Sequence, residues 1–173
     1  WSFLYGSKPT VLTALLLDAD GYVVLYRSGR DIHIDDAGLD LPLDKFPASL
    51  VNTGKELALF DPSGKEIDRI AYEKAKVGIA WERSETGFHL STDERGGTPG
   101  SANSSPDDEP EDPDRPDTPH KPGIPTDIIV LPNEIVFNEL LPNPYPEGSE
   151  YIELYNRSDR TLPLAGLSVA TRK

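Results

Sequence analysis

Closely spaced acidic residues are the first feature of this chain that could do chemistry. Residues 18–21 read Asp-Ala-Asp-Gly, which is how many calcium-binding loops begin, with carboxylates placed to contact one ion. The later acidic positions and the closing glutamate of such a loop are missing. A polar turn between two strands is therefore favoured, and we predict no cofactor, with calcium retained as the only alternative.

A second acidic group surrounds a histidine. His33 is flanked by three carboxylates, at Asp31, Asp35 and Asp36. These side chains could form an oxygen-rich site, but charged residues with this spacing are more often solvated along a strand edge. We favour the strand edge.

Histidine is also the side chain best suited to acid–base catalysis near neutral pH. The chain has three, His33, His89 and His120, and they lie in different segments. No nucleophile elbow, phosphate loop or His-Glu-x-x-His pattern is present. Glu139 and Glu153 are expected to be structural, accepting backbone N–H or tyrosine O–H hydrogen bonds where strands bend. We predict that the chain is not an enzyme.

Aromatic residues outside the expected core are the candidate ligand contacts. Trp81 and Tyr72 are expected to pack inside the protein. Trp1, Phe88 and Tyr145 fall in loops or at the end of the chain, where a carbohydrate or peptide could stack. These three are the predicted site residues, with core packing or chance exposure as the simpler interpretation.

Composition limits the partners and the setting. The formal net charge is −13, which argues against binding to a nucleic-acid backbone. The chain has no cysteine, which fits an exported bacterial protein, and no apolar run near the ~20 residues that span a bilayer. It has no methionine and opens on Trp1, so we expect a processed product or an excised fragment.

A tract rich in proline and acidic residues divides the chain. Residues 105–126 form this linker, because such a composition cannot bury enough apolar surface to offset the entropy of ordering it. Residues 1–104 and 127–173 flank it, and both show short runs of alternating or apolar residues separated by turns. No stretch has helical periodicity, so the sequence predicts an all-β sandwich or barrel.

Before the tract, the pattern predicts several strands. Residues 11–17 and 22–26 are expected to pair through the turn at 18–21, and 31–35 alternate like a half-buried strand. Residues 36–47 are expected to form a loop. The clearest hairpin joins 56–60 to 66–72 through a turn at 61–64, with a one-residue offset that could mark a bulge. Two further strands are predicted at 79–83 and 87–91.

After the tract, strands are predicted at 134–140 and 151–156. They are separated by a proline- and glycine-rich loop over residues 142–148. One more strand or half-turn is predicted within 162–169.

The two flanking pieces resemble different parts of one family. The motifs of residues 135–139, 150–156 and 164–167 are similar to the opening of a lamin-tail domain, an immunoglobulin-like β-sandwich. The motifs of residues 21–25, 57–68, 81–83 and 98–103 are similar to its closing part. The resemblance covers most of the chain outside the linker, but the closing part comes first.

This order leaves two arrangements open. Either the piece after the linker completes the piece before it within one chain, as a circular permutation, or it completes a neighbouring molecule by strand swapping. A linker of this length could span a sandwich, since a polyproline-like segment extends by ~3.1 Å per residue.

The resemblance implies a bacterial module that occurs in large secreted proteins. We expect a non-catalytic extracellular or cell-surface unit that serves as a spacer, an adhesion unit or a binding unit for a protein or glycan. The alternative is the substrate-targeting domain of a secreted hydrolase of the nuclease or phosphatase type.

Overall fold

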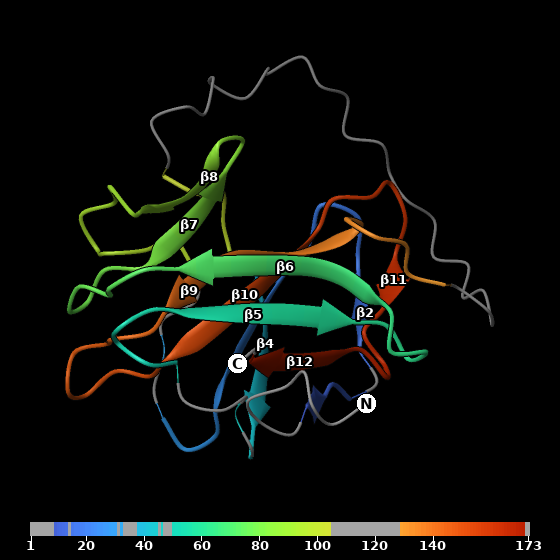
Figure 1. Cartoon of the computed structure of the whole chain (residues 1–173), viewed down its shortest axis with the longest axis horizontal. Helices are drawn as coiled ribbons and strands as arrows, with labels where there is room; N and C mark the ends of the chain where they lie inside the picture. The colour runs from blue at the N-terminus through green and yellow to red at the C-terminus, as the bar shows by residue number, and fades with distance from the viewer. Residues whose placement is uncertain are drawn as a thin grey trace.

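The protein is all-β over the residues that the structure describes (Figure 1). The computed structural model describes residues 9–13, 15–30, 32, 38–44, 46, 50–104 and 129–171. We call the described residues up to 104 the first segment and residues 129–171 the second segment. No helix occurs in either segment.

Twelve strands make up the described fold. The first segment contains β1 (Thr10–Val11), β2 (Leu16–Leu17), β3 (Tyr22–Arg27), β4 (Gly38–Leu43), β5 (Lys55–Phe60), β6 (Glu66–Tyr72), β7 (Trp81–Ser84) and β8 (Gly87–Leu90). The second segment contains β9 (Ile135–Leu141), β10 (Tyr151–Asn156), β11 (Leu162–Pro163) and β12 (Ser168–Thr171).

These strands form two main sheets in a sandwich-like arrangement. A four-stranded sheet has the order β1-β12-β5-β6, and a six-stranded sheet has the order β4-β3-β10-β9-β7-β8. Strands β11 and β2 form a small separate pair. The β5 and β6 arrows cross in front of β9 and β10 in Figure 1, as expected for stacked layers.

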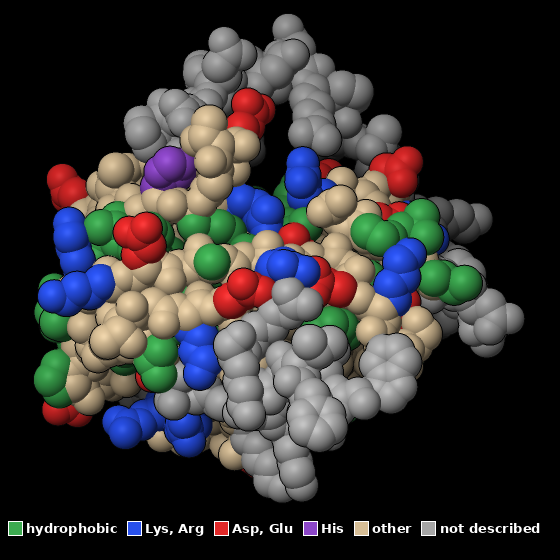
Figure 2. All heavy atoms as spheres, viewed as in Figure 1, with side chains coloured by type: hydrophobic (Ala, Val, Ile, Leu, Met, Phe, Trp, Pro, Cys, Tyr) green, Lys and Arg blue, Asp and Glu red, His purple; other side chains and the backbone are tan. Residues whose placement is uncertain are grey.

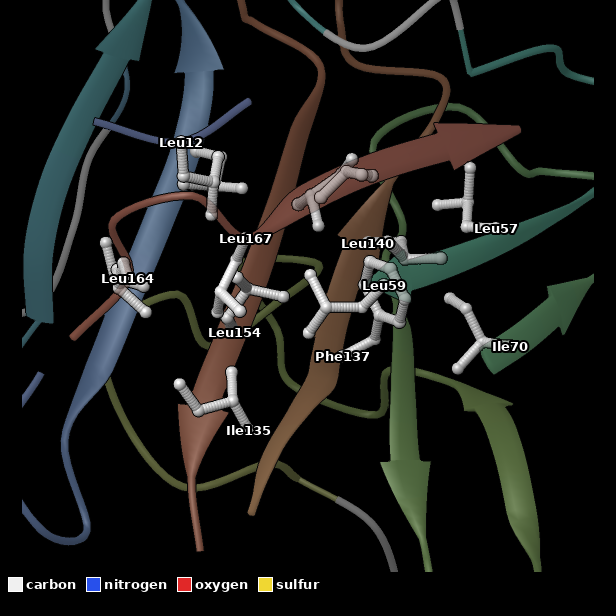
Figure 3. Packing of buried hydrophobic residues seen from close by; sticks show 14 of the residues in the cluster. Leu12, Leu57, Leu59, Ile70, Ile135, Phe137, Leu140, Leu154, Leu164 and Leu167 are labelled. Carbon is white, nitrogen blue, oxygen red and sulfur yellow. The ribbon is translucent and has the colours of Figure 1, made fainter. Parts of the chain in front are cut away.

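The main hydrophobic core lies between the two sheets (Figure 3). Leu57, Leu59 and Ile70 come from the four-stranded sheet, and Phe137 and Leu154 face them from the six-stranded sheet. Inward residues alternate along each strand because side chains in a strand point to opposite faces. The apolar residues at alternating strand positions therefore form the core.

Both sheets require both segments. The second segment's β10 pairs with β3 on one side and with β9 on the other, and β9 continues to β7. In the other sheet β12 lies between β1 and β5. The strands after the linker thus complete the sheets formed by the strands before it, within a single chain.

The strongest local predictions are confirmed. β5 and β6 form the expected hairpin, and its register shifts next to Ile67, which is the predicted bulge. Ile67, Ile70 and Tyr72 are all buried, as the offset pattern requires. β10 spans the predicted residues, and β7, β8 and β9 lie within a residue or two of their predicted bounds.

The predicted hairpin of residues 11–17 with 22–26 is wrong. The turn exists, with the Gly21 N–H donating to the Asp18 carbonyl at 3.0 Å. The run before it, however, is split into β1 and β2, which pair with β12 and β11, while β3 pairs with β4 and β10. Leu12 and Leu17 are buried, so this run is held by core packing and by the second segment rather than by its neighbour in sequence.

Two further predictions need correction. Residues 36–47, expected to be a loop, contain β4, which runs parallel to β3. Its Pro42 is tolerated because β4 is the edge of the sheet, where a missing N–H breaks no ladder. Residues 162–169 hold β11 and the start of β12 rather than one strand. The strand expected at 31–35 lies outside the described residues except for Ile32.

The surface carries charges of both signs. Figure 2 shows Asp and Glu side chains interspersed with Lys and Arg over the face that β5 and β6 present to the viewer. No helix among the described residues has the length and apolar character needed to cross a membrane.

Candidate functional site

The loop after β9 holds the most exposed aromatic residue of the described chain. Tyr145 is 64% exposed, whereas the other large exposed apolar side chains outside this loop are aliphatic. The loop contains three prolines and turns back at Gly148, whose N–H donates to the Tyr145 carbonyl at 2.8 Å. Proline fixes φ and so stiffens the loop in the unfolded and folded states alike.

The tyrosine ring lies on a glycine. A Cβ atom added at Gly78 would overlap the ring of Tyr145, and Gly78 has a φ of 67°, which favours glycine. The Gly78 N–H donates to the Asn143 carbonyl at 2.7 Å, and Asn52 donates to the Asn143 side chain at 3.1 Å. The exposed ring is thus held in place by the first segment.

Two adjoining hollows meet at Tyr145. The first has a volume of about 290 Å³ and a largely apolar lining that includes Pro99, Leu141 and Tyr151. The second has a volume of about 500 Å³ and includes Arg27, Arg30, Asn52 and Asn143. Pro144, Tyr145, Gly148 and Ser149 belong to both linings. We call the two hollows together the Tyr145 groove.

The groove combines an apolar wall with hydrogen-bond donors. Arg27 and Arg30 are among the residues that line its second hollow, and Arg95 lines the first, bonded to Asp93 at 3.1 Å. Glu150 also lines the second hollow, where burial raises the pKa of its carboxyl and Arg27 partly opposes this. An aromatic wall beside planar donors is suited to a ligand with one apolar face and several oxygen acceptors.

Behind the first hollow, three glutamates stand in register on adjacent strands. Glu82 on β7 is opposite Glu139 on β9, and Glu139 is opposite Glu153 on β10. All three are at most 1% exposed. We call them the glutamate ladder. A bulge places Asn138 as an extra residue on β9, which puts Phe137 in the core and Glu139 on the outer face of the sheet.

Like charges directly opposite one another are unfavourable, so the ladder needs compensation. The segment 98–104 covers it and supplies donors. Thr98 donates its N–H and its hydroxyl to Glu139 at 3.0 and 3.1 Å, Gly100 donates its N–H to Glu153 at 2.5 Å, and Ser104 donates its N–H to Glu82 at 2.8 Å. These bonds dock the end of the first segment onto the sheet.

Burial is the largest influence on the pKa values of Glu139 and Glu153. It raises the pKa of Glu139 to about 7, although hydrogen bonds from Tyr151 and Thr98 favour the charged form. It raises the pKa of Glu153 well above its ordinary value, and the neighbouring Glu139 adds to the effect. Glu139 and Glu153 therefore hold protons that exposed glutamates would have released.

Tyr151 connects the ladder with the groove. Its ring lines the first hollow, and its hydroxyl donates to Glu139. Gly97 makes this approach possible, because a Cβ there would overlap both the Glu139 carboxylate and the Tyr151 hydroxyl. The expected structural role of Glu139 and Glu153, as acceptors of backbone and tyrosine donors, agrees with these contacts.

The three predicted ligand contacts have different surroundings. Tyr145 lines both hollows of the Tyr145 groove. Phe88 packs against the main core with the Arg83 guanidinium 5.3 Å above its ring, and it belongs to neither hollow. Trp1 lies outside the described residues. Of the two predicted core aromatics, Tyr72 is buried and Trp81 is half-buried against the core.

The aspartates of the turn at 18–21 accept hydrogen bonds from the second segment. Asp18 accepts a hydrogen bond from the Thr161 hydroxyl at 2.9 Å, and Asp20 accepts one from Tyr155 at 2.8 Å. No cluster of metal-ligating side chains occurs in the part of the chain that the structure describes. His89 is exposed and bonded to Thr86, while His33 and His120, with Asp31, Asp35 and Asp36, lie outside that part.

Some members of the site were not found from the sequence. Gly78 and the two arginines of the second hollow carry no local motif, because their role depends on which loop the fold brings against them. The position of Glu82 could have been predicted. It lies in the predicted strand 79–83 next to Trp81, which is expected to face the core, so alternation places Glu82 on the opposite face of the sheet.

Comparison with known proteins adds no relative: no family model matches the chain, and no curated protein or solved structure matches it either.

Proposed function

We propose that this chain is a non-catalytic, immunoglobulin-like β-sandwich module of the lamin-tail type that binds a glycan in the Tyr145 groove. The setting we propose is extracellular or at the surface of a bacterial cell. The observation that carries the proposal is the fixed, 64%-exposed ring of Tyr145 at the junction of two hollows. A preordered aromatic ring binds with a smaller loss of conformational entropy than a mobile one.

The chemistry of the groove favours a saccharide. The apolar face of a sugar ring stacks on an aromatic side chain, while its hydroxyl groups bond to planar donors at the rim. Arg30, Asn52 and Asn143 offer such donors next to Tyr145. The glutamate ladder supports a non-catalytic role in a different way, since its carboxylates accept internal hydrogen bonds and fix segment 98–104.

A saccharide-retention experiment tests this function. The chain is run by affinity electrophoresis through gels that contain neutral or anionic polysaccharides, with retardation as the readout. We expect Tyr145→Ala to weaken retention about tenfold, which is the order of an aromatic stacking contact, and Tyr145→Phe to preserve it. Leu131→Ala is the matched control, because Leu131 is an exposed apolar residue outside the groove.

The result that contradicts the proposal is equally plain. If no polysaccharide retards the chain, or if Tyr145→Ala and Leu131→Ala behave alike, the groove is not a glycan site. Retardation by a polysaccharide in this assay is also what the alternative, a substrate-targeting domain of a secreted hydrolase, requires. A spacer with no ligand would give no retention at all.

A further inference from the structure

More than half of the pairs of neighbouring strands in the described part of the chain join the two segments. Of the nine pairings between described strands, five cross from the first segment to the second. They are β1–β12, β3–β10, β2–β11, β5–β12 and β7–β9. Without the second segment, β3 and β7 would be unpaired edges in the middle of the six-stranded sheet.

The core is divided in the same way. Ten of the 22 buried residues in the main cluster belong to the second segment, among them Phe137, Ile152 and Leu154. Neither segment alone encloses this cluster. Each segment would expose a large apolar face, which is the kind of surface that selects a partner.

Buried polar contacts also cross the boundary and make the fit specific. Asp68 on β6 accepts the Phe137 N–H at 2.8 Å, and the Asn103 and Asn138 amides bond to each other at 3.1 and 2.9 Å. The Asn156 amide donates to the Leu17 and Asp18 carbonyls at 3.0 and 2.9 Å. A segment in another register would leave these groups unpaired, at a cost for each.

The only covalent connection between the segments is the proline- and acid-rich sequence 105–128. The first segment ends where Ser104 bonds to Glu82 on β7, and the second begins where the Ile129 carbonyl accepts from Arg160. β7 and β11, which follows Arg160, lie on opposite sides of the molecule in Figure 1. None of the five crossing pairings depends on which chain supplies the second segment.

We propose that the second segment is an exchangeable complement, and that the partner it fits is the first segment of another copy of this chain. Reciprocal exchange between two copies gives a closed dimer, and successive donation gives a head-to-tail assembly. Because the Tyr145 groove takes Tyr145 and Pro144 from the second segment and Gly78 and Arg27 from the first, an exchanged assembly contains grooves built from two chains. The proposal does not depend on the ligand of that groove.

A cleavable linker tests complementation in the full chain. Residues 112–118 are replaced by a seven-residue protease site, and the folded protein is cut. We expect both pieces to stay in one complex on size-exclusion chromatography. Two cut samples, one of them isotopically heavy, are then unfolded together in urea and refolded. Native mass spectrometry should find about half of the complexes to be hybrids, the statistical share.

Separation of the pieces after cleavage, or refolding that yields no hybrid complex, overturns the proposal.

A second variant tests exchange without cleavage. Deleting residues 106–127 leaves Ser105 and Ile128 between the segments, a reach of about 11 Å. Ser104 bonds to Glu82, opposite Glu139, and Arg160 bonds to Glu134 as well as to Ile129. Glu134 precedes β9 and lies five residue steps before Glu139, a distance of about 16 Å along an extended chain.

We expect that the shortened chain can close on itself only by releasing the contacts that hold Ser104 and Ile129 at its ends. We expect it to form a folded dimer at micromolar concentration, while the intact chain remains monomeric because its linker gives the attached segment a millimolar effective concentration. A folded monomer from the shortened chain contradicts the proposal. If that variant fails to fold, the hybrid count of the cut protein decides the question.

Discussion

The ring of Tyr145 lies against Gly78, which precedes it by 67 residues in the sequence and lies on the other side of the linker. The contact joins the two segments at the groove. It requires both the absence of a side chain at Gly78 and its positive φ of 67°.

Replacing Gly78 with alanine should therefore have two costs. A positive φ disfavours alanine by roughly 1–2 kcal/mol, and the new methyl group must displace the Tyr145 ring, which adds about 1–3 kcal/mol. Gly64→Ala is the matched control, because Gly64 also has a positive φ, of 83°, but a Cβ there meets nothing within 4 Å. Urea unfolding should show a clearly larger loss of stability for Gly78→Ala. Equal losses would mean that the tyrosine ring moves aside freely.

The sequence predicted what short-range patterns determine. The hairpin of β5 and β6 was found with its bulge because two alternating runs are joined by a compact turn containing Pro62 and Gly64. β9 and β10 were found because their apolar residues alternate or run together. In each case the elements close in sequence are also the elements that pair.

Prediction failed where the pairing is distant in sequence. Residues 11–17 were assigned to a hairpin because the turn beside them was recognised, but their partners, β11 and β12, lie beyond the linker. β4 was missed because Pro42 and Gly38 are typical of loops, and only its place at the sheet edge makes them acceptable. Of the residues that form the groove, the sequence indicated only Tyr145 as a candidate ligand contact. Gly78 and the two arginines are brought to the groove by the tertiary fold.

The contact between Asp68 and Arg83 is predicted to matter more than exposed ion pairs. Asp68 accepts from Arg83 at 2.6 Å and from the Phe137 N–H at 2.8 Å, and its side chain is 5% exposed. Asp68→Ala would leave a buried N–H and a half-buried guanidinium unpaired, so we expect a loss of about 3 kcal/mol. Chemical denaturation at neutral pH measures it.

The pair of Glu66 with Arg69 provides the comparison on the same strand. Arg69 bonds to Glu66 at 2.7 Å, but the two side chains are 45% and 28% exposed. Solvent screening limits such a pair, so Glu66→Ala should cost less than about 1 kcal/mol. A Glu66→Ala loss as large as that of Asp68→Ala would show that burial is not what distinguishes the two pairs.

Asn156 is predicted to be the most sensitive amide in the described chain. It is fully buried, donates to the Leu17, Asp18 and Arg160 carbonyls, and accepts from Ser158. Asn156→Ala would leave several of these groups unpaired, and we expect a loss of at least about 3 kcal/mol. Asn156→Asp keeps the size of the side chain but replaces donors with acceptors, so it should be no better tolerated. Thermal unfolding of both variants would contradict this if the aspartate variant matched the native chain.

The glutamate ladder predicts that stability falls as the pH rises from about 4.5 to about 7. Burial raises the pKa of Glu139 to about 7 in the folded protein, from an ordinary value near 4.5. In this window the folded state binds more protons than the unfolded state, so raising the pH favours unfolding. The shift corresponds to about 3 kcal/mol of stability. The protein has this stability below the window, where folding does not have to bury a charged Glu139, and loses it above the window.

Glu139→Gln separates this effect from other titrations. Glutamine resembles the protonated acid in size and keeps one carbonyl oxygen for the Thr98 donors, so the variant should be close to the native chain in stability at pH 5. At pH 8 it should be more stable than the native chain, because no charge has to be buried. The measurement is the free energy of unfolding in urea between pH 4.5 and 8. Parallel curves for the two proteins would mean that Glu139 keeps its ordinary pKa in the folded state, since such a group contributes no slope in this range.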